Sequence, residues 1–68
     1  MRSHPIIDAL RLRREELGLS SRALSLRMGY GEETVRHWES GQNYPTVRSL
    51  QDWVQSLGMK LKVERGDE

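Results

Sequence analysis

Helix-ending sequences interrupt this chain at short intervals and limit every helix to a few turns. The interruptions are Pro5 and the stretches LGLS, MGYG, ESGQNYP and SLGM, which contain glycine, proline or small polar residues that end helices or form turns. No internal repeat, low-complexity tract or Ser/Gly-rich linker lies between them. The sequence therefore predicts a compact all-α domain of four short helices over residues 1–58, followed by a tail.

The first two helices follow from the spacing of apolar residues and from the residues at the helix ends. Pro5 suits a first helical turn, and apolar side chains then recur every three or four residues up to about residue 17. Ser20 can cap the second helix, because its hydroxyl can accept a hydrogen bond from an unpaired backbone N–H of the next turn. Gly29 can adopt the left-handed conformation that ends this helix.

The third and fourth helices are predicted from the same signals. We expect the third to begin near Gly31, which can occupy an N-cap, and to end in the stretch WESG, with Val35 and Trp38 pointing into the core. The fourth begins at Thr46, and one stripe of apolar residues faces the core: Val47, Leu50, Trp53, Val54 and Leu57.

The tail changes the period of the pattern. Met59, Leu61 and Val63 alternate with charged residues, as in a β-strand. A single strand leaves its backbone N–H and C=O groups unpaired, and pairing with the same strand of a second copy is the simplest remedy. We therefore predict that residues 59–68 form a short C-terminal strand and acidic tail that dimerise the chain. A frayed end and a fifth helix are the alternatives.

Size and composition exclude several classes of protein. A chain of 68 residues buries only about 60% of its unfolded surface, so a partner subunit is an expected source of stability. The absence of Cys excludes disulfides and thiolate metal sites. No stretch approaches the roughly 20 apolar residues of a membrane span, and the apolar run near the N-terminus is too short for a signal peptide. We expect a soluble, cytoplasmic protein.

Net charge favours no particular partner, because 11 basic residues oppose 10 acidic ones and the formal net charge is +1. The arrangement is more informative, since arginines concentrate in the first part of the chain and the end, VERGDE, is acidic. Arginine suits bidentate contacts with phosphate or guanine, although it is equally common on solvated helix faces.

The run from Ser20 to Gly41 carries the strongest functional signal. Two short helices joined by a glycine turn form a helix-turn-helix, and the second helix of such a motif fits the major groove of DNA. Over residues 6–58 the sequence resembles the phage repressor and Cro (XRE) family, which includes many bacterial antitoxins. The resemblance rests on motifs in order and at family spacing: LGLS, Leu24, Gly29, Val35, WESG and Pro45.

Three positions depart from the family pattern. Ser21 stands where the family usually has a Gln that touches the DNA backbone, Ser25 where it prefers Ala, and Gly31 where it often has Ser or Thr. The alternating tail replaces the usual fifth helix and is similar to that of family members that dimerise through a C-terminal strand. These departures affect how the domain docks on DNA, not its fold.

The resemblance also implies a contact between helices. In the family, an Arg near the end of the first helix pairs with the Glu of the WE motif, and the matching residues are Arg14 and Glu39. We expect a partly buried ion pair that joins the first and third helices. Neither residue is expected to contact DNA.

Family positions that read bases map to the start of the third helix and one turn later: Glu32, Glu33, Arg36 and His37. Contacts with the DNA backbone are expected around the starts of the second and third helices and in the loop after the third: Ser21, Arg22, Thr34, Gln42, Asn43 and Tyr44. No cofactor or metal ion is expected, since Glu33 and His37 provide only two ligands of a metal site.

Two glutamates at the start of a DNA-reading helix need an explanation, because DNA is polyanionic. Carboxylates in a first helical turn stabilise the helix by about 0.3–1 kcal/mol through its dipole. One carboxylate can also accept a hydrogen bond from a cytosine amino group. Finally, Glu32 and Arg36 lie four residues apart, as do Glu33 and His37, so Glu32 can steer Arg36 toward guanine. These interpretations are compatible, and acids at this helix end lower non-specific attraction to phosphate.

The sequence thus predicts a sequence-specific regulator of double-stranded DNA, a Cro-like repressor that binds a near-palindromic operator as a homodimer. The resemblance places it at the nucleoid of a bacterial cell or phage-infected host. An enzyme is not expected, because no nucleophile with His and acid partners and no phosphate-binding loop is visible. The alternative is an interaction protein, either the antitoxin of a toxin or a helix-turn-helix with weak DNA affinity. The short tail favours the regulator.

Overall fold

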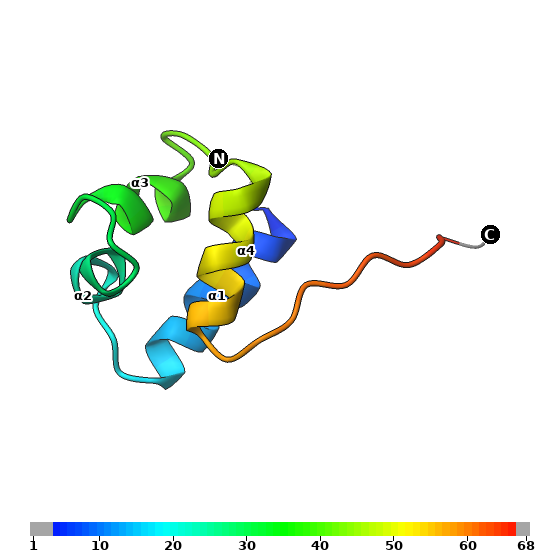
Figure 1. Ribbon diagram of the computed structural model, residues 1–68, viewed down its shortest axis with the longest axis horizontal. Coiled ribbons are helices and arrows are strands. Elements are labelled where there is room, and N and C mark those ends of the chain that lie inside the picture. Colours follow the sequence, from blue (N-terminus) through cyan, green and yellow to red (C-terminus); the bar gives the residue numbers. More distant parts are fainter. Residues whose placement is uncertain (1–3, 67–68) are drawn as a thin grey trace.

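The computed structural model describes residues 4–66 and contains four α-helices: α1 (Pro5–Glu16), α2 (Ser21–Arg27), α3 (Thr34–Ser40) and α4 (Val47–Ser56) (Figure 1). The predicted all-α class is confirmed, and residues 4–66 contain no β-strand. No helix in this range is long and apolar enough to cross a membrane. Residues 1–3 of the predicted domain and residues 67–68 of the predicted tail lie outside the described residues.

A side-chain cap marks the start of α2, as the sequence predicted, and a second one marks the start of α4. The hydroxyl of Ser20 accepts a hydrogen bond from the N–H of Ala23, and the hydroxyl of Thr46 accepts one from the N–H of Ser49. The prediction that Val47 faces the core is wrong. Val47 is the first residue of α4 and is 76% exposed, and its neighbours Thr46 and Arg48 are exposed as well.

The predicted start of α3 is also wrong. Glu33, not Gly31, occupies the N-cap, and its side chain makes no capping hydrogen bond. The N–H of Thr34 bonds the Gly31 carbonyl and closes a turn before the helix. Glu32 and Glu33 therefore precede the first turn of α3, and they do not hold the first-turn positions assumed for the helix-dipole interpretation.

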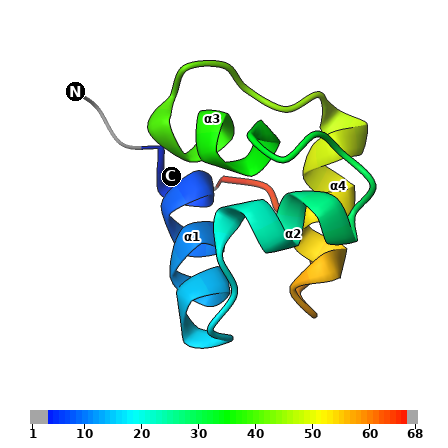
Figure 2. The same ribbon diagram turned by 90° about the vertical axis from the view of Figure 1, so that its left-hand side faces the viewer.

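α2 and α3 lie together on one side of the domain, and α1 and α4 support them from behind (Figures 1 and 2). α2 ends where Gly29 adopts a φ of 86°, which places the Tyr30 N–H on the Ser25 carbonyl. This reversal lets the chain enter α3 after a short turn. The arrangement is a helix-turn-helix.

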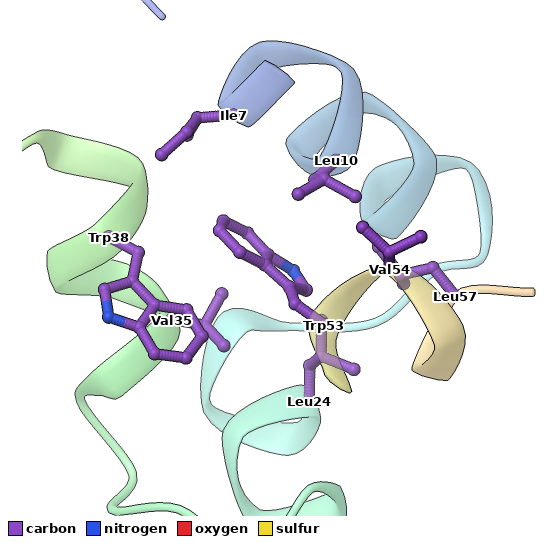
Figure 3. Packing of buried hydrophobic residues seen from close by; sticks show 8 residues of the cluster. All are labelled: Ile7, Leu10, Leu24, Val35, Trp38, Trp53, Val54 and Leu57. Carbon is purple, nitrogen blue, oxygen red and sulfur yellow. The ribbon is translucent and has the colours of Figure 1, made fainter. Parts of the chain in front are cut away.

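Apolar side chains from all four helices form one core (Figure 3): Ile7, Leu10, Leu24, Val35, Trp38, Trp53, Val54 and Leu57. Trp53 of α4 is fully buried and contacts Trp38 of α3, with ring centroids 5.1 Å apart. The prediction that both tryptophans serve packing is confirmed. The Nε1 of Trp53 has no hydrogen-bond partner within residues 4–66, a cost of about 1–3 kcal/mol that the buried indole area offsets.

A buried hydroxyl joins α2 to α3. Ser25 is fully buried, and its Oγ donates a hydrogen bond to the Ser21 carbonyl at 2.8 Å. The same Oγ accepts a hydrogen bond from the N–H of Val35 at 2.9 Å. Val35 is the second residue of α3, so its N–H has no acceptor within the helix. Ser25 therefore provides from α2 the cap that Glu33 does not supply.

A bidentate ion pair joins α1 to α3. Nε of Arg14 donates to one carboxylate oxygen of Glu39 at 2.7 Å, and Nη2 donates to the other at 2.9 Å. The Nη1 of Arg14 donates to the Leu19 carbonyl at 2.7 Å, so the same guanidinium also holds the loop before α2. Only 13% of the Arg14 side chain and 11% of the Glu39 side chain are exposed. The hydrogen bond with Glu39 raises the pKa of Arg14.

The side chain of Tyr30 fixes the turn between α2 and α3 to α4. Its hydroxyl donates a hydrogen bond to Oδ2 of Asp52 at 2.8 Å and lies 3.2 Å from Oγ of Ser49. Its ring packs edge-on against Trp38, with centroids 5.6 Å apart. The turn is thus bound to α4 by hydrogen bonds and to α3 by ring packing.

The tail after α4 extends away from the domain, on the side opposite to α2 and α3 (Figure 1). Between residues 59 and 66 it forms no strand within the single chain. Leu61 is 42% exposed and Val63 is 94% exposed, so two of the apolar side chains assigned to the strand leave apolar surface open to solvent. A strand needs a partner strand, and residues 4–66 of a single chain provide none for the tail. Strand pairing between two copies therefore stays a prediction.

Ser25→Ala removes the acceptor for the Val35 N–H and leaves a buried donor without a partner. We expect the free energy of unfolding to fall by about 1–3 kcal/mol. Urea denaturation followed by circular dichroism measures the change. Ser56→Ala is the matched control, because its helical hydroxyl only donates to the Trp53 carbonyl. An equal loss in both variants would show that the Ser25 hydroxyl is not a cap.

Glu39→Gln keeps the shape of the side chain but leaves the guanidinium of Arg14 without its counter-ion. We expect unfolding to become easier by about 1.5–3 kcal/mol, because the partner charge stays largely buried. Glu15→Gln is the control: its carboxylate lies 3.9 Å from Arg14 but is 55% exposed, so its loss costs about 0–1 kcal/mol. The same denaturation experiment compares them, and equal midpoints would contradict the role assigned to Glu39.

Candidate nucleic-acid interface

The outer face of the helix-turn-helix carries three of the four residues predicted to read bases. Glu32, Glu33 and Arg36 are exposed at the start of α3, whereas Val35 and Trp38 on the same helix are buried in the core. α3 therefore presents one polar face to solvent. An α-helix with such a face can enter the major groove of DNA.

Arg36 pairs with Glu33, three residues earlier. Its Nε donates a hydrogen bond to Oε1 of Glu33 at 2.5 Å. Glu33 also lies one helical turn before His37, since the His37 N–H donates to the Glu33 carbonyl and, after the hydrogen bond and charge of Arg36, the charge of His37 contributes to the lowered pKa of Glu33. The hypothesis that Glu32 steers Arg36 is wrong as a pairing. The physical reason is the late start of α3, since Glu32 lies in the preceding turn and is not one helical turn from Arg36.

Glu32 pairs with a residue of α2. Its Oε1 lies 3.5 Å from Nε of Arg22, and the two side chains are 54% and 67% exposed. Arg22 is in the first turn of α2, so this contact crosses from one helix of the motif to the turn before the other. It places a predicted backbone-contacting residue beside a predicted base-reading residue.

The two pairs balance the charge of this face, with two arginines against two glutamates. The hydrogen bond and charge of Arg36 hold the pKa of Glu33 below the ordinary value for glutamate, with smaller contributions from His37 and Arg22. Glu33 therefore remains ionised at neutral and mildly acidic pH. A neutral face attracts phosphate weakly, and salt screens what attraction remains.

His37 differs from the other predicted base-reading residues. Its side chain is half-buried in the last turn of α3, and its carbonyl accepts hydrogen bonds from the N–H groups of Gln42 and Asn43. It therefore helps to shape the loop after α3. Among residues 4–66, no three His, Cys, Asp or Glu side chains cluster closely enough to hold a metal ion.

The residues predicted to contact the DNA backbone lie at two places. Around the starts of α2 and α3, Arg22 is exposed, while Ser21 and Thr34 are half-buried. The loop between α3 and α4 exposes the remaining three: Gln42, Asn43 and Tyr44. Because the N–H groups of Gln42 and Asn43 already bond the protein, side chains of this loop are its better candidates for phosphate contacts.

Sequence reasoning missed two residues that position this face. Ser25 carries a detectable signal, because a serine at a position where the family prefers alanine invites a search for a buried partner. Asp52 carries none, because its contact with Tyr30 joins residues 22 positions apart and depends on how α4 packs. Neither residue is assigned a contact with DNA. Ser25 holds the start of α3, and Asp52 holds the turn between α2 and α3.

Comparison with known proteins agrees with this geometry. The family model described as Helix-turn-helix matches residues 10–63, which is most of the chain. Searches of curated proteins and of solved structures found no significant match. The chain therefore belongs to the XRE-type helix-turn-helix family of the phage repressor and Cro type, and it is a DNA-binding regulator.

Proposed function

We propose that the protein is a Cro-like transcriptional repressor that reads a near-palindromic operator as a homodimer. The observation that carries this proposal is the exposed Arg36, which is 65% accessible at the start of α3 on the face away from the core. Arginine in this place can bind O6 and N7 of guanine in the major groove. Glu32 and Glu33 beside it can accept a hydrogen bond from a cytosine amino group.

Contacts with phosphate orient α3 in the groove. Arg22 and Ser21 at the start of α2 would bind one side of the groove, and the loop side chains of Gln42, Asn43 and Tyr44 would bind the other. Thr34 would contribute from the start of α3. Such contacts fix the register of the helix without reading sequence. Repression follows because a protein that occupies a promoter excludes polymerase.

The homodimer is proposed to form through the tail, by strand pairing of Met59, Leu61 and Val63 with the same residues of a second copy. Support comes from the exposed side chains of Leu61 and Val63 and from the direction of the tail, which leaves α2 and α3 uncovered. A two-fold dimer must place its two α3 helices in successive major grooves. The operator half-sites would then be about 34–36 Å apart.

A second candidate function is that of an antitoxin that holds a toxin. The observation in its favour is an apolar hollow of about 420 Å³ between α1, α4 and the loop that joins α3 to α4. Tyr44 and Ile6, which line it, are 62% and 41% exposed. Exposed apolar surface of this kind often marks a protein-binding site. The two functions are compatible, since a toxin would bind at this hollow and DNA would bind at α3.

Selection of bound duplexes from a random DNA pool tests the regulator directly. We expect enrichment of a near-palindrome with half-sites about one turn apart, bound at least about 10³-fold more tightly than random duplex. Arg36→Ala should weaken binding to the selected duplex by about 1–3 kcal/mol and relax the preference at one base. Arg22→Ala is the contrast, because loss of a phosphate contact weakens binding to all sequences alike.

Thermal unfolding of each variant confirms that the domain is intact before affinities are compared. Unchanged affinity and base preference in Arg36→Ala would remove this residue from the reading role. Failure of the wild-type chain to enrich any duplex, with only weak binding that salt abolishes, would instead favour the protein-binding function.

Sedimentation equilibrium tests the dimer. The wild-type chain should sediment as a dimer at micromolar concentration, and Leu61→Lys should shift it toward the monomer, because a charged side chain cannot be buried in the interface without a partner. Leu12→Lys is the control, since Leu12 is 54% exposed on α1 and lies outside the tail. A wild-type monomer, or a dimer unaffected by Leu61→Lys, would contradict the proposed interface.

A further inference from the structure

The two arginines of the DNA-facing surface are both paired with glutamates, but the pairs differ in geometry. Arg36 and Glu33 are joined by a hydrogen bond of 2.5 Å. Arg22 and Glu32 lie 3.5 Å apart, which is longer than an ordinary charge-assisted hydrogen bond. Arg36 is therefore oriented by its partner, whereas Arg22 is attracted by its partner without being fixed.

The contact of Arg36 with Glu33 uses only Nε. Within residues 4–66, the terminal amino groups of Arg36 donate no hydrogen bond to the protein. These two groups are the ones that an arginine directs at O6 and N7 of guanine when it approaches end-on. Fixing a long, exposed side chain in advance reduces the entropy lost on binding. Glu33 thus binds Nε of Arg36 and leaves the two terminal amino groups available to bind guanine.

The contact of Arg22 with Glu32 has the opposite consequence. This contact also involves Nε, so the terminal amino groups of Arg22 can reach a phosphate while Glu32 stays beside the guanidinium. The Glu32 carboxylate then lies close to that phosphate and repels it, whereas the Glu33 carboxylate beside Arg36 faces a guanine, which is neutral. The repulsion by Glu32 weakens every complex in which Arg22 binds phosphate. A non-specific complex has no base contacts of α3 to outweigh it.

We propose that the two adjacent glutamates have opposite effects on DNA binding: Glu33 positions Arg36 for guanine, and Glu32 weakens binding to phosphate, and so to non-specific DNA, by repelling the phosphate that Arg22 would bind. The proposal rests on the proposed function of this face as a DNA reader. The lowered pKa of Glu33 agrees with a pair that persists over the pH range of a cell. Glutamates that were merely solvated would give the two positions the same phenotype.

The test compares Glu32→Gln and Glu33→Gln with Glu16→Gln. All three substitutions raise the net charge by one, and Glu16 forms a comparable exposed pair with Arg13 on α1, at 3.4 Å. Fluorescence anisotropy measures Kd for the selected duplex and for a random duplex at several salt concentrations. Comparison with Glu16→Gln removes the general effect of the added charge.

The two variants should then diverge. Glu32→Gln should tighten binding to random duplex by about threefold to tenfold and steepen the dependence of log Kd on log salt by about 0.9, the value for one further phosphate contact. Glu33→Gln should weaken binding to the selected duplex by about fivefold to fiftyfold and relax the preference at one base. Its binding to random duplex should match that of Glu16→Gln.

A measurement on the free protein separates positioning from direct contact with DNA. In the NMR spectrum, the Arg36 Nε–H should exchange slowly with water in the wild type and rapidly in Glu33→Gln. A wild-type chain that selects no duplex overturns the proposed function and this proposal with it. A wild-type chain that selects a duplex, with both variants indistinguishable from Glu16→Gln, overturns only the roles of the two glutamates.

Discussion

The bidentate contact between Arg14 and Glu39 is the constraint on which the placement of α3 depends. α3 has only seven residues, too few to be stable as an isolated helix, so its position comes from the contacts at its ends. Glu39 fixes its last turn to α1, and the same guanidinium fixes the Leu19 carbonyl ahead of α2. One buried cation therefore sets the relative positions of three helices. The outer face of α3 can vary without disturbing this frame.

The first turn of α3 is held by a different polar contact, which comes from a departure from the family pattern. Ser25, where alanine is usual, brings a hydroxyl from α2 to the N–H of Val35. The two ends of α3 are thus attached to different helices, one by a neutral hydrogen bond and one by an ion pair. Polar groups buried with full partners specify one arrangement more strictly than apolar packing does.

Much of the fold could be predicted because it depends on local signals. The Ser20 cap indicated the start of α2, the loop with Pro45 indicated the start of α4, and apolar spacing indicated the buried faces of Val35, Trp38 and Trp53. The start of α3 could not be predicted, because its cap comes from Ser25, ten residues earlier. The prediction that Glu32 pairs with Arg36 then failed for the same reason, since partners at three or four residues depend on where the helix begins. The contact of Arg22 with Glu32 crosses a turn and has no sequence period, and pairing of the tail requires a second chain.

The contact between the two indole rings has a practical consequence. Trp38 belongs to α3 and Trp53 to α4, their ring centroids are 5.1 Å apart, and these are the only tryptophans in the chain. The near-ultraviolet signal of the protein therefore reports mainly on whether α3 is seated against α4. Neither ring lies on the outer face of α3, so a ligand bound there would reach the indoles only by moving the helix. A change in this signal on binding would thus distinguish movement of α3 from docking on a fixed surface.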